Sequence, residues 1–485
     1  MSVQLVILVV YMIALLAVSW YSTKLMKKST NPVVGFFLAG RGVPWIIVVA
    51  LLFGTAIGGT STVGVAEQAY TRGLSAGWYN GAWGIGAVIA GLFFVRHTRK
   101  WRKTTVPEIM GEMFGPGARY ISVISMIVFM LVILSLQFVA GGSILTALLP
   151  QYFPSMTHGM ILSAIVFVFI TLIGGMWASG LSNFISCLVI IIGVILSVFF
   201  AVPHFGGWDS IIAALPQDLP QRAPGRWTSL TAGLGAGMIF GYIGSFVVQG
   251  PGAQSTAQIA FAAKGGKTAR FGFLVAGICI FPFGFICAIF GIIGAARFPG
   301  LERAAMALPR VVSEIPPAVG GTLLAALWAA DVSTAVGILM AVATMVVNDV
   351  IKKLLKIDVK HDLLLSRICV FGAAVLGLLM AMTIVGMVAT ITAAMAITST
   401  FTIFFLSNIY FPKLLKKAMG FWMILISLIV FVLWQYTPAL SWLKPALAGQ
   451  VVFLLIILNI VMFILFAIFA KEPANIMVEY AEDDD

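Results

Sequence analysis

The stretch Leu52-Phe-Gly-Thr-Ala-Ile-Gly-Gly-Thr-Ser-Thr62 interrupts a long apolar segment with glycines and hydroxyl side chains. A second interruption, Gly250-Pro-Gly252, lies within another apolar segment. Paired glycines and a proline both weaken an α-helix. In a bilayer, the backbone groups that such a break exposes persist only where they line a protein cavity or a ligand site. Two breaks in a membrane protein therefore predict a binding site, although glycines can also serve only to allow close helix packing.

The composition indicates that the chain does lie in a membrane. Of its 485 residues, 61% are hydrophobic and only 9% are charged, and the mean hydropathy is +1.08. A soluble protein of this size needs more polar surface than this. Apolar runs of about 20 residues, enough to cross a bilayer as a helix, recur from end to end. The net charge of +12 does not indicate nucleic acid, because the basic residues form short clusters between these runs.

The apolar runs predict thirteen transmembrane spans. Their approximate bounds are 3–23, 44–70, 73–95, 119–149, 157–175, 181–203, 231–257, 271–295, 318–350, 364–382, 384–410, 419–437 and 447–470. The loops that this count places on one side hold 22 of the 29 Lys and Arg residues. Because cytoplasmic loops are enriched in Lys and Arg, we expect a multi-pass protein of the cell membrane with its N-terminus outside and its C-terminus in the cytoplasm.

Each interrupted span begins a block of five spans. The blocks cover residues 44–203 and 231–410, and the broken spans that open them cross the membrane in opposite directions. Inverted repeats with broken helices at matching positions are typical of secondary transporters. We therefore expect a single transmembrane transporter domain over residues 1–485, all α-helical, with a 5+5 inverted repeat. One extra N-terminal helix (1–23) and two extra C-terminal helices (419–470) would be peripheral.

Several motifs resemble those of the sodium/solute symporters. Phe36-Phe-Leu-Ala-Gly-Arg-Gly-Val-Pro-Trp45 resembles the start of that family's transport core, and Ala69-Tyr-Thr-Arg-Gly-Leu74 is similar to a motif further along it. The inner loop that ends Ala262-Ala-Lys-Gly-Gly-Lys-Thr-Ala-Arg270 and the span with Ala329-Ala-Asp-Val-Ser-Thr334 follow in family order. The resemblance implies a leucine-transporter-like fold and the import of a small organic solute coupled to Na⁺.

The resemblance also implies a Na⁺ site made of oxygen atoms. Its expected ligands are the backbone carbonyls of Gly54, Ile57 and Ala330 and the hydroxyls of Ser333 and Thr334. All five positions can supply oxygen, and the last three share one helix face because they are spaced at i, i+3 and i+4. Taken alone, a Ser-Thr pair in a membrane helix more often bonds back to a helix carbonyl.

A second sodium site that some family members have is not expected here. Asn183 stands where that site has an acidic residue, and Val336 and Gly337 stand where it has hydroxyls. We therefore expect one Na⁺ per cycle. Asp331 lies in the middle of a span, where a charged residue usually indicates function. It could balance the charge of Na⁺ or carry a proton; the alternative is that it is protonated or paired with a polar neighbour.

Substrate contacts in the family cluster on the broken helices and the third span. By position, the candidates here are Ser61, Asn80 and Gln254, followed by Gln137 and Gln249. All are neutral, and amides at this depth often only bond a neighbouring helix. Exposed N–H groups at the breaks would favour an anionic group. This pattern favours an amino acid or a monocarboxylate as substrate without establishing either.

Other functions fit the sequence less well. The main alternative is a proton-coupled symporter of the same fold that uses Asp331. A channel needs a continuous polar path, whereas these spans hold isolated polar residues. An enzyme is not expected, because the four histidines lie in loops or near span ends and the four cysteines form no CxxC pair. The expected partners are the solute, Na⁺ and the lipid bilayer, with no nucleic acid and no obligate protein partner.

Overall fold

The computed structural model describes residues 38–216, 225–357, 362–384 and 386–480, together with short pieces between residues 6 and 21. Within these ranges, the side chains of residues 173–183, 333, 348, 362, 363 and 436 are not described. The expected peripheral helix 1–23 is therefore described only in part. The side chains of Ser333 and Asn183 lie outside the described residues.

The described chain is almost entirely helical. Its first half contains η1 (Ala39–Arg41), α3 (Trp45–Ala56), η2 (Thr60–Gly64), α4 (Val65–Arg72), η3 (Leu74–Gly77), α5 (Trp78–Phe93), α6 (Val95–Lys100), α7 (Val106–Phe114), α8 (Pro116–Leu148), α9 (Met156–His204) and α10 (Gly207–Ala213). Its second half contains α11 (Ala236–Gly252), α12 (Gln254–Ala262), α13 (Gly266–Ile280), α14 (Phe283–Arg297), η4 (Ala304–Met306), α15 (Ala307–Glu314), α16 (Pro317–Met345), η5 (Val346–Leu354), α17 (Asp362–Ala381), α18 (Met387–Met395), η6 (Ala396–Thr398), α19 (Ser399–Tyr410), η7 (Pro412–Leu414), α20 (Lys417–Tyr436), η8 (Ser441–Leu443) and α21 (Val451–Phe469).

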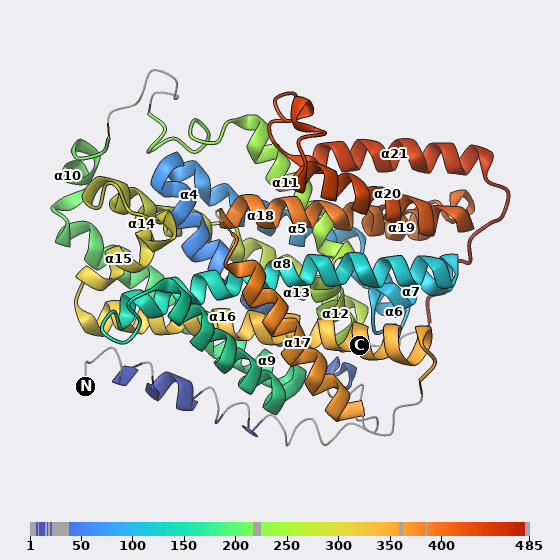
Figure 1. The fold of residues 1–485 in the computed structure, drawn as a ribbon, viewed down its shortest axis with the longest axis horizontal. Coiled ribbons are helices and arrows are strands. Elements are labelled where there is room, and N and C mark those ends of the chain that lie inside the picture. The colour runs from blue at the N-terminus through green and yellow to red at the C-terminus, as the bar shows by residue number, and fades with distance from the viewer. Residues whose placement is uncertain are drawn as a thin grey trace.

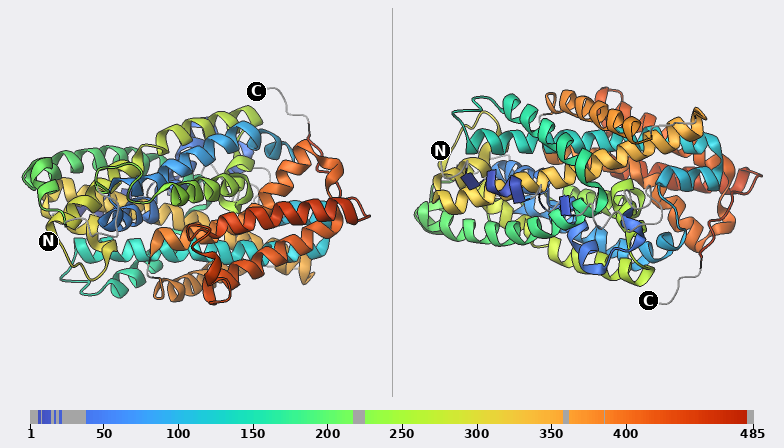
Figure 2. Two further views of the ribbon diagram at one scale, coloured as in Figure 1. Left: turned by 90° about the horizontal axis from the view of Figure 1, so that it is seen from above. Right: turned by 90° about the horizontal axis from the view of Figure 1, so that it is seen from below.

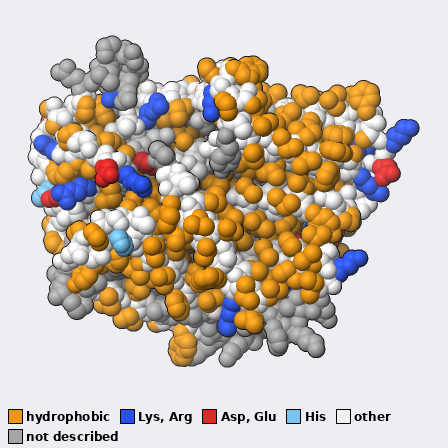
Figure 3. Space-filling view, in the orientation of Figure 1, with side chains coloured by type: hydrophobic (Ala, Val, Ile, Leu, Met, Phe, Trp, Pro, Cys, Tyr) orange, Lys and Arg blue, Asp and Glu red, His pale blue; other side chains and the backbone are white. Residues whose placement is uncertain are grey.

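The long helices form a bundle along the longest axis of the molecule, with α8 and α16 running its length (Figures 1 and 2). Hydrophobic side chains cover most of the visible surface between the two ends, and charged side chains lie mostly toward the ends (Figure 3). In the described residues, eight helices are long and apolar enough to cross a membrane, or nine if one bent pair is a single span. The protein is thus an all-α membrane protein, as predicted, and the count of thirteen spans stays a prediction.

One end of the bundle carries Arg41, Lys100, Lys103, Arg119 and Lys416, and we call it the basic end. Contacts described below bring these residues together with α6, α7 and the end of the chain. In Figure 1 this end lies to the right, where α6, α7 and α12 are found.

The first predicted break is confirmed. Helix α3 ends at Ala56, and Ile57 leaves helical geometry with φ −96° and ψ 69°. The chain resumes as a wide π-helical turn, η2, and continues as α4; the two parts are bent by 57°. Gly58 and Gly59 occupy the bend itself, as expected from their low helix propensity.

The second predicted break is also confirmed. Helix α11 carries Pro251 in its last turn and ends at Gly252. Ala253 is extended, with φ −86° and ψ 139°, and α12 starts at Gln254. The proline has no N–H to continue the helix, so the chain changes direction one residue after the Gly-Pro-Gly motif.

Small residues bring the helices around the breaks close together. A side chain at Gly86 on α5 would stand 2.5 Å from the carbonyl oxygen of Phe246 on α11. A side chain at Gly59 would overlap Ala140 of α8. These close approaches are typical of membrane helix interfaces. They pack α5 and α8 directly against the two broken spans.

A buried polar cluster holds the C-terminal helices to one another. Asn459 of α21 donates to Ser427 of α20 at 3.0 Å and to Ser399 of α19 at 3.2 Å. The Thr400 hydroxyl oxygen lies 3.0 Å from both Asn459 Oδ1 and Ser427 Oγ, and its single proton is shared between them. All four side chains are buried. Each polar group therefore has a partner at a depth where water is absent.

Candidate functional site at the two helix breaks

A small cavity lies where the two broken spans meet. Thr55, Thr60 and Ser61 line it from the first break, and Gln249 and Ser255 line it from the second. Residues of α5, α8, α16 and α18 complete its walls. Its volume is about 20 Å³, which is room for about one water molecule. An organic solute can enter only if the surrounding helices move apart.

Two of the five expected sodium ligands, Gly54 and Thr334, contact each other beside the first break. Thr334 is buried, and its hydroxyl donates a hydrogen bond to the carbonyl oxygen of Gly54 at 2.5 Å. A side chain at Gly58 would stand 3.0 Å from the same hydroxyl oxygen. The end of a helix leaves its last carbonyls without intrahelical partners, so the bend after Ala56 makes carbonyl oxygens available beside Thr334. Ile57 and Ala330 lie on these same two elements.

Asp331 lies against the bend itself. It is fully buried, and neither carboxyl oxygen has a hydrogen-bond partner among the described residues. A side chain at Gly59 would stand 3.0 Å from Asp331 Oδ1. Asp331 and Thr334 therefore flank successive glycines of the break. A buried carboxyl group without a partner is costly, which makes Asp331 a candidate for binding something that the fold itself does not supply.

Gln137 supports the bend from α8. Its side-chain oxygen accepts a hydrogen bond from Gly59 N at 3.0 Å. Its amide nitrogen donates to Ile133 O at a long 3.4 Å. The break frees the Gly59 N–H, and Gln137 satisfies it while also lining the cavity.

The five predicted substrate residues divide into two groups. Ser61, Gln137 and Gln249 line the cavity. Asn80 and Gln254 do not line it. Asn80 is buried between α5 and α14, where a side chain at Gly284 would stand 2.8 Å from Asn80 Cβ, and its amide has no hydrogen-bond partner among the described residues.

Gln254 bonds backbone groups near the basic end. Its side-chain oxygen accepts from Val106 N at 2.8 Å, and its amide donates to Thr104 O at 3.3 Å. It faces away from the cavity although the next residue, Ser255, lines it. Only the three-dimensional arrangement shows which of these neighbours faces the cavity.

Several cavity residues were not predicted. The hydroxyls of Thr60 and Ser255 are buried and lack hydrogen-bond partners among the described residues. Tyr79 and Trp83 of α5 form an aromatic wall, and Tyr79 packs edge-on against Phe246 with ring centroids 5.1 Å apart. Thr60 lies within the first interrupted stretch and Ser255 lies three residues after the Gly-Pro-Gly motif, so the positions of the breaks carried a signal for both hydroxyls. The aromatic residues had no comparable signal.

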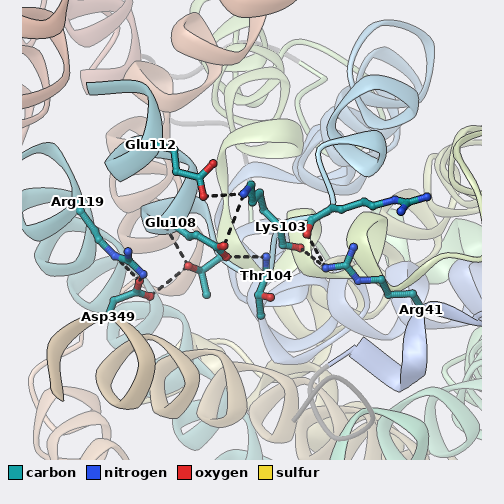
Figure 4. A network of polar contacts seen from close by, with 9 residues as sticks. Arg41, Lys103, Thr104, Glu108, Glu112, Arg119 and Asp349 are labelled. Carbon is teal, nitrogen blue, oxygen red and sulfur yellow. Dashed lines mark hydrogen bonds and ion pairs between the residues drawn. The ribbon is translucent and has the colours of Figure 1, made fainter. Parts of the chain in front are cut away.

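At the basic end, a polar network surrounds the turn between α6 and α7 (Figure 4). Asp349, fully buried in η5 at the end of α16, accepts from Arg119 Nε at 2.7 Å and is ion-paired with Arg119 Nη2. Thr105 caps α7 and donates to the other carboxyl oxygen of Asp349 at 3.1 Å. The ion pair thereby joins α8, η5 and the start of α7.

Two further elements reach the same turn. Arg41, just before α3, donates to Arg102 O at 2.6 Å, and Gln254 at the start of α12 bonds Thr104 and Val106 as described above. Burial lowers the pKa of Arg41 from its ordinary value, although nearby Glu108 opposes this effect. We call residues 101–105 the α6–α7 turn. Both broken spans and η5, which continues α16, are bonded to it.

Taken together, two broken membrane helices enclose one cavity and offer oxygen atoms to it, which is the arrangement of a secondary transporter. The sodium:solute symporter family matches residues 36–417 of the chain. The protein belongs to the sodium:solute symporter family, which confirms the resemblance seen in the sequence.

Individual relatives are distant. The chain is 24% identical to a sodium/glucose cotransporter of Vibrio parahaemolyticus over 383 residues, which is 73% of this chain and 70% of that protein. It is 26% identical to sodium/glucose cotransporter 1 of Sus scrofa and 24% identical to the sodium/myo-inositol cotransporter of Homo sapiens. These two matches cover 44% and 43% of this chain but only 32% and 29% of the relatives.

Solved structures share the fold. A Na⁺-coupled sialic acid symporter in a substrate-bound outward-open state gives a TM-score of 0.75 at 16% identity, over 98% of this chain and 99% of that one. A nucleobase-cation-symport-1 family transporter gives 0.59 at 15% identity, over 89% and 92%. MhsT in complex with L-phenylalanine gives 0.56 at 15% identity, over 86% and 98%. The leucine-transporter-like fold is thus confirmed.

Proposed function

We propose that the protein is a Na⁺-coupled secondary active symporter that imports a small organic solute by alternating access. The observation that carries this proposal is the contact of Thr334 with Gly54 beside a cavity lined by both broken spans. Alternating access would come from movement of the repeats 44–203 and 231–410 around this cavity. We place the basic end in the cytoplasm of the cell, because Lys and Arg accumulate on that side of membrane proteins.

The Na⁺ site would use the carbonyls of Gly54, Ile57 and Ala330 with the hydroxyls of Ser333 and Thr334. Unwound carbonyls and the negative end of a half-helix favour a cation, and the Gly54 carbonyl near the end of α3 faces Thr334 of α16. The hydroxyl of Thr334 already touches the Gly54 carbonyl oxygen. Na⁺ would separate these two oxygens and bind between them.

Asp331 would balance the positive charge of the ion. It faces Gly59, the residue directly after the glycine that faces Thr334, and has no hydrogen-bond partner among the described residues. A carboxylate this deeply buried is stabilised most by a nearby positive charge. Some family members have an acidic residue at the position that Asn183 occupies here. In this chain Asp331 would take over the role of that acidic residue.

The substrate would be an amino acid or a monocarboxylate. No Lys or Arg lines the cavity among the described residues, so a carboxylate would be bound by backbone N–H groups at the starts of η2 and α12 and by the unpartnered hydroxyls of Thr60 and Ser255. Ser61, Gln137 and Gln249 would orient the remainder of the solute, with Asn80 and Gln254 reached only if the helices rearrange. Some relatives are named for glucose or myo-inositol. Neutral solutes with many hydroxyl groups are therefore the alternative substrate class that uptake assays must include.

The test is solute uptake into proteoliposomes with the purified protein. We expect uptake to require an inward Na⁺ gradient, and an inside-negative potential of 100 mV to add about 2.3 kcal/mol for each Na⁺ that moves. Amino acids, monocarboxylates, glucose and myo-inositol are compared side by side, with K⁺ or choline replacing Na⁺ as control. Uptake that is indifferent to both Na⁺ and voltage would refute the symporter.

Asp331→Asn tests the role of the acid. If Asp331 balances the ion, the variant needs a much higher Na⁺ concentration for half-maximal uptake while its substrate preference is retained. A variant that loses a dependence of uptake on the proton gradient, with no change in Na⁺ dependence, would instead indicate proton coupling. If the uptake rate, its Na⁺ dependence and its dependence on the proton gradient were all unchanged in the variant, Asp331 would have no role in coupling.

A further inference from the structure

The end of the chain lies across the basic end as an extended segment. We call residues 472–480 the C-terminal strap; they follow α21 and contain no helix. The strap starts beside the connection that precedes α20. There Pro473 and Lys416 form an isolated antiparallel bridge, and Ala474 N donates to Leu415 O at 3.0 Å.

The middle of the strap covers the end of α7. Asn475 N donates to Met113 O at 2.9 Å, and the Asn475 side chain donates to Glu112 O at 2.8 Å. These are carbonyls that the end of a helix leaves without intrahelical partners. Met477 is buried, and its N–H donates to the side chain of Asn408 on α19 at 2.9 Å. The strap therefore joins α7 to α19.

The far end of the strap reaches α6 and the α6–α7 turn. Tyr480 N donates to Lys100 O at 3.2 Å. The carboxylate of Glu479 lies 2.6 Å from His97 Nδ1 and 3.4 Å from Lys100 Nζ. The guanidinium of Arg102 lies over the Tyr480 ring, 5.6 Å from its centroid, within the range of a cation–π interaction.

The strap and the broken spans thus hold the same turn from two sides. Arg41 and Gln254 fasten the α6–α7 turn to the starts of α3 and α12, and Asp349 fastens it to η5 at the end of α16. The strap fastens the flanking α6 and α7 to α19 and to the start of α20. For the basic end to open, α3 and α12 must part from this turn or carry it with them, and carrying it would break strap contacts.

We propose that the C-terminal strap is a built-in clamp that holds the basic end closed and so sets how often the transporter opens there. This inference rests on the proposed function in one respect, namely that alternating access requires this end to open. A segment that makes contacts in only one of two states shifts the equilibrium toward that state. The strap contacts oppose the opening movement in which α3 and α12 carry the α6–α7 turn with them, so they favour the closed state.

The experiment measures access to the cavity from each side of the membrane. Ser255→Cys places a thiol in the cavity wall of the full-length chain, and a membrane-impermeant maleimide is added to one face of oriented vesicles at a time. In this background, Asn475→Ala with Glu479→Gln weakens the strap at two points. We expect modification from the basic-end side to become about three- to tenfold faster, as loss of one or two modest hydrogen bonds implies. Modification from the opposite side should slow or stay unchanged.

The matched control is Lys471→Gln, which changes an exposed residue just before the strap and should leave the rate unaltered. Chains that retain Ser255 report any reaction of the four native cysteines. Equal rates in the strap variant and the control, with equal melting temperatures, would overturn the proposal.

A second variant covers the case in which the strap variant does not fold. His97→Cys with Glu479→Cys allows the strap to be tethered to α6 by oxidation. We expect the tether to suppress modification of the Ser255→Cys thiol from the basic-end side and a reductant to restore it; modification that ignores the tether would overturn the proposal. Neither assay needs Na⁺ or solute, so strap-dependent access without Na⁺-driven uptake would refute the proposed function and leave the clamp standing.

Discussion

Replacement of Gly59 by alanine should disrupt the first helix break through steric overlap alone. Gly59 has ordinary helical angles, φ −53° and ψ −41°, so a side chain adds no backbone strain. The new Cβ would overlap Ala140 Cβ, stand 3.5 Å from Ala140 Cα and 3.0 Å from Asp331 Oδ1. Carbon atoms pack best at about 3.5–4.0 Å, so α8 and the break must separate by roughly 1.5 Å.

Overpacking of this kind costs about 1–3 kcal/mol. The same separation pulls Gly59 N away from Gln137 Oε1, to which it donates a hydrogen bond at 3.0 Å. Because the cost falls on the closed packing at the centre of the site, a midrange 2 kcal/mol would change the population of that state by roughly 30-fold. We therefore expect Na⁺-driven uptake to fall about tenfold or more.

Gly337→Ala is the matched control. Gly337 lies on α16 three residues after Thr334, and a side chain there would meet no atom within 4 Å. In a helix interior, alanine is favoured over glycine by about 0.5–1 kcal/mol. Melting temperature and uptake are measured for both variants in parallel, and Gly59→Ala should be lower in both. Equal values for the two variants would show that the close packing around Gly59 does not support the site.

Three further outcomes follow from single contacts. Thr334→Val keeps the shape of the side chain but removes the hydroxyl, so the Na⁺ concentration for half-maximal uptake should rise at least about tenfold. Thr334→Ser keeps a hydroxyl and should change this concentration little. Equal effects of the two variants would exclude the hydroxyl as a ligand. Arg119→Met leaves the buried Asp349 carboxylate without its positively charged partner and should cost about 3–5 kcal/mol of stability. The melting temperature should fall, and adding Asp349→Asn should partly restore it; no recovery in the double variant would contradict this reasoning. Asn459→Leu leaves the hydroxyls of its cluster without their shared partner, so the free energy of unfolding should fall by about 1–3 kcal/mol. The Na⁺ dependence of uptake should stay constant, and a changed Na⁺ dependence would contradict a purely structural role.

Much of the fold could be predicted because its signals are local. Glycine pairs and the Gly-Pro-Gly motif weaken a helix wherever they occur, and both breaks lie within one or two residues of those motifs. Membrane insertion follows from composition alone. Span boundaries were harder, because hydropathy alone does not locate the turn between two spans. Ser163 and Gly193 of α9 contact α16 at Trp328 and Leu323, only five residues apart, so the chain reverses direction between them.

The site could be predicted only in part. Ser61, Gln137 and Gln249 line the cavity, whereas Gln254 faces the α6–α7 turn although it lies beside a break. Asn80 is adjacent to the cavity residue Tyr79 but lies between two other helices. Neighbouring residues on a helix point about 100° apart, so a small rotation of the packed helix decides which of them meets the cavity.

The sequence by itself determined that this chain lies in a membrane, that two of its helices break, and which residues could offer oxygen to an ion. Only the tertiary structure placed Thr334 on Gly54, set Asp331 against Gly59, and laid the C-terminal strap over the α6–α7 turn. The physical reason is distance along the chain. Hydropathy and helix propensity act within a few turns of helix, whereas these contacts join segments hundreds of residues apart, whose alignment depends on how every helix between them packs.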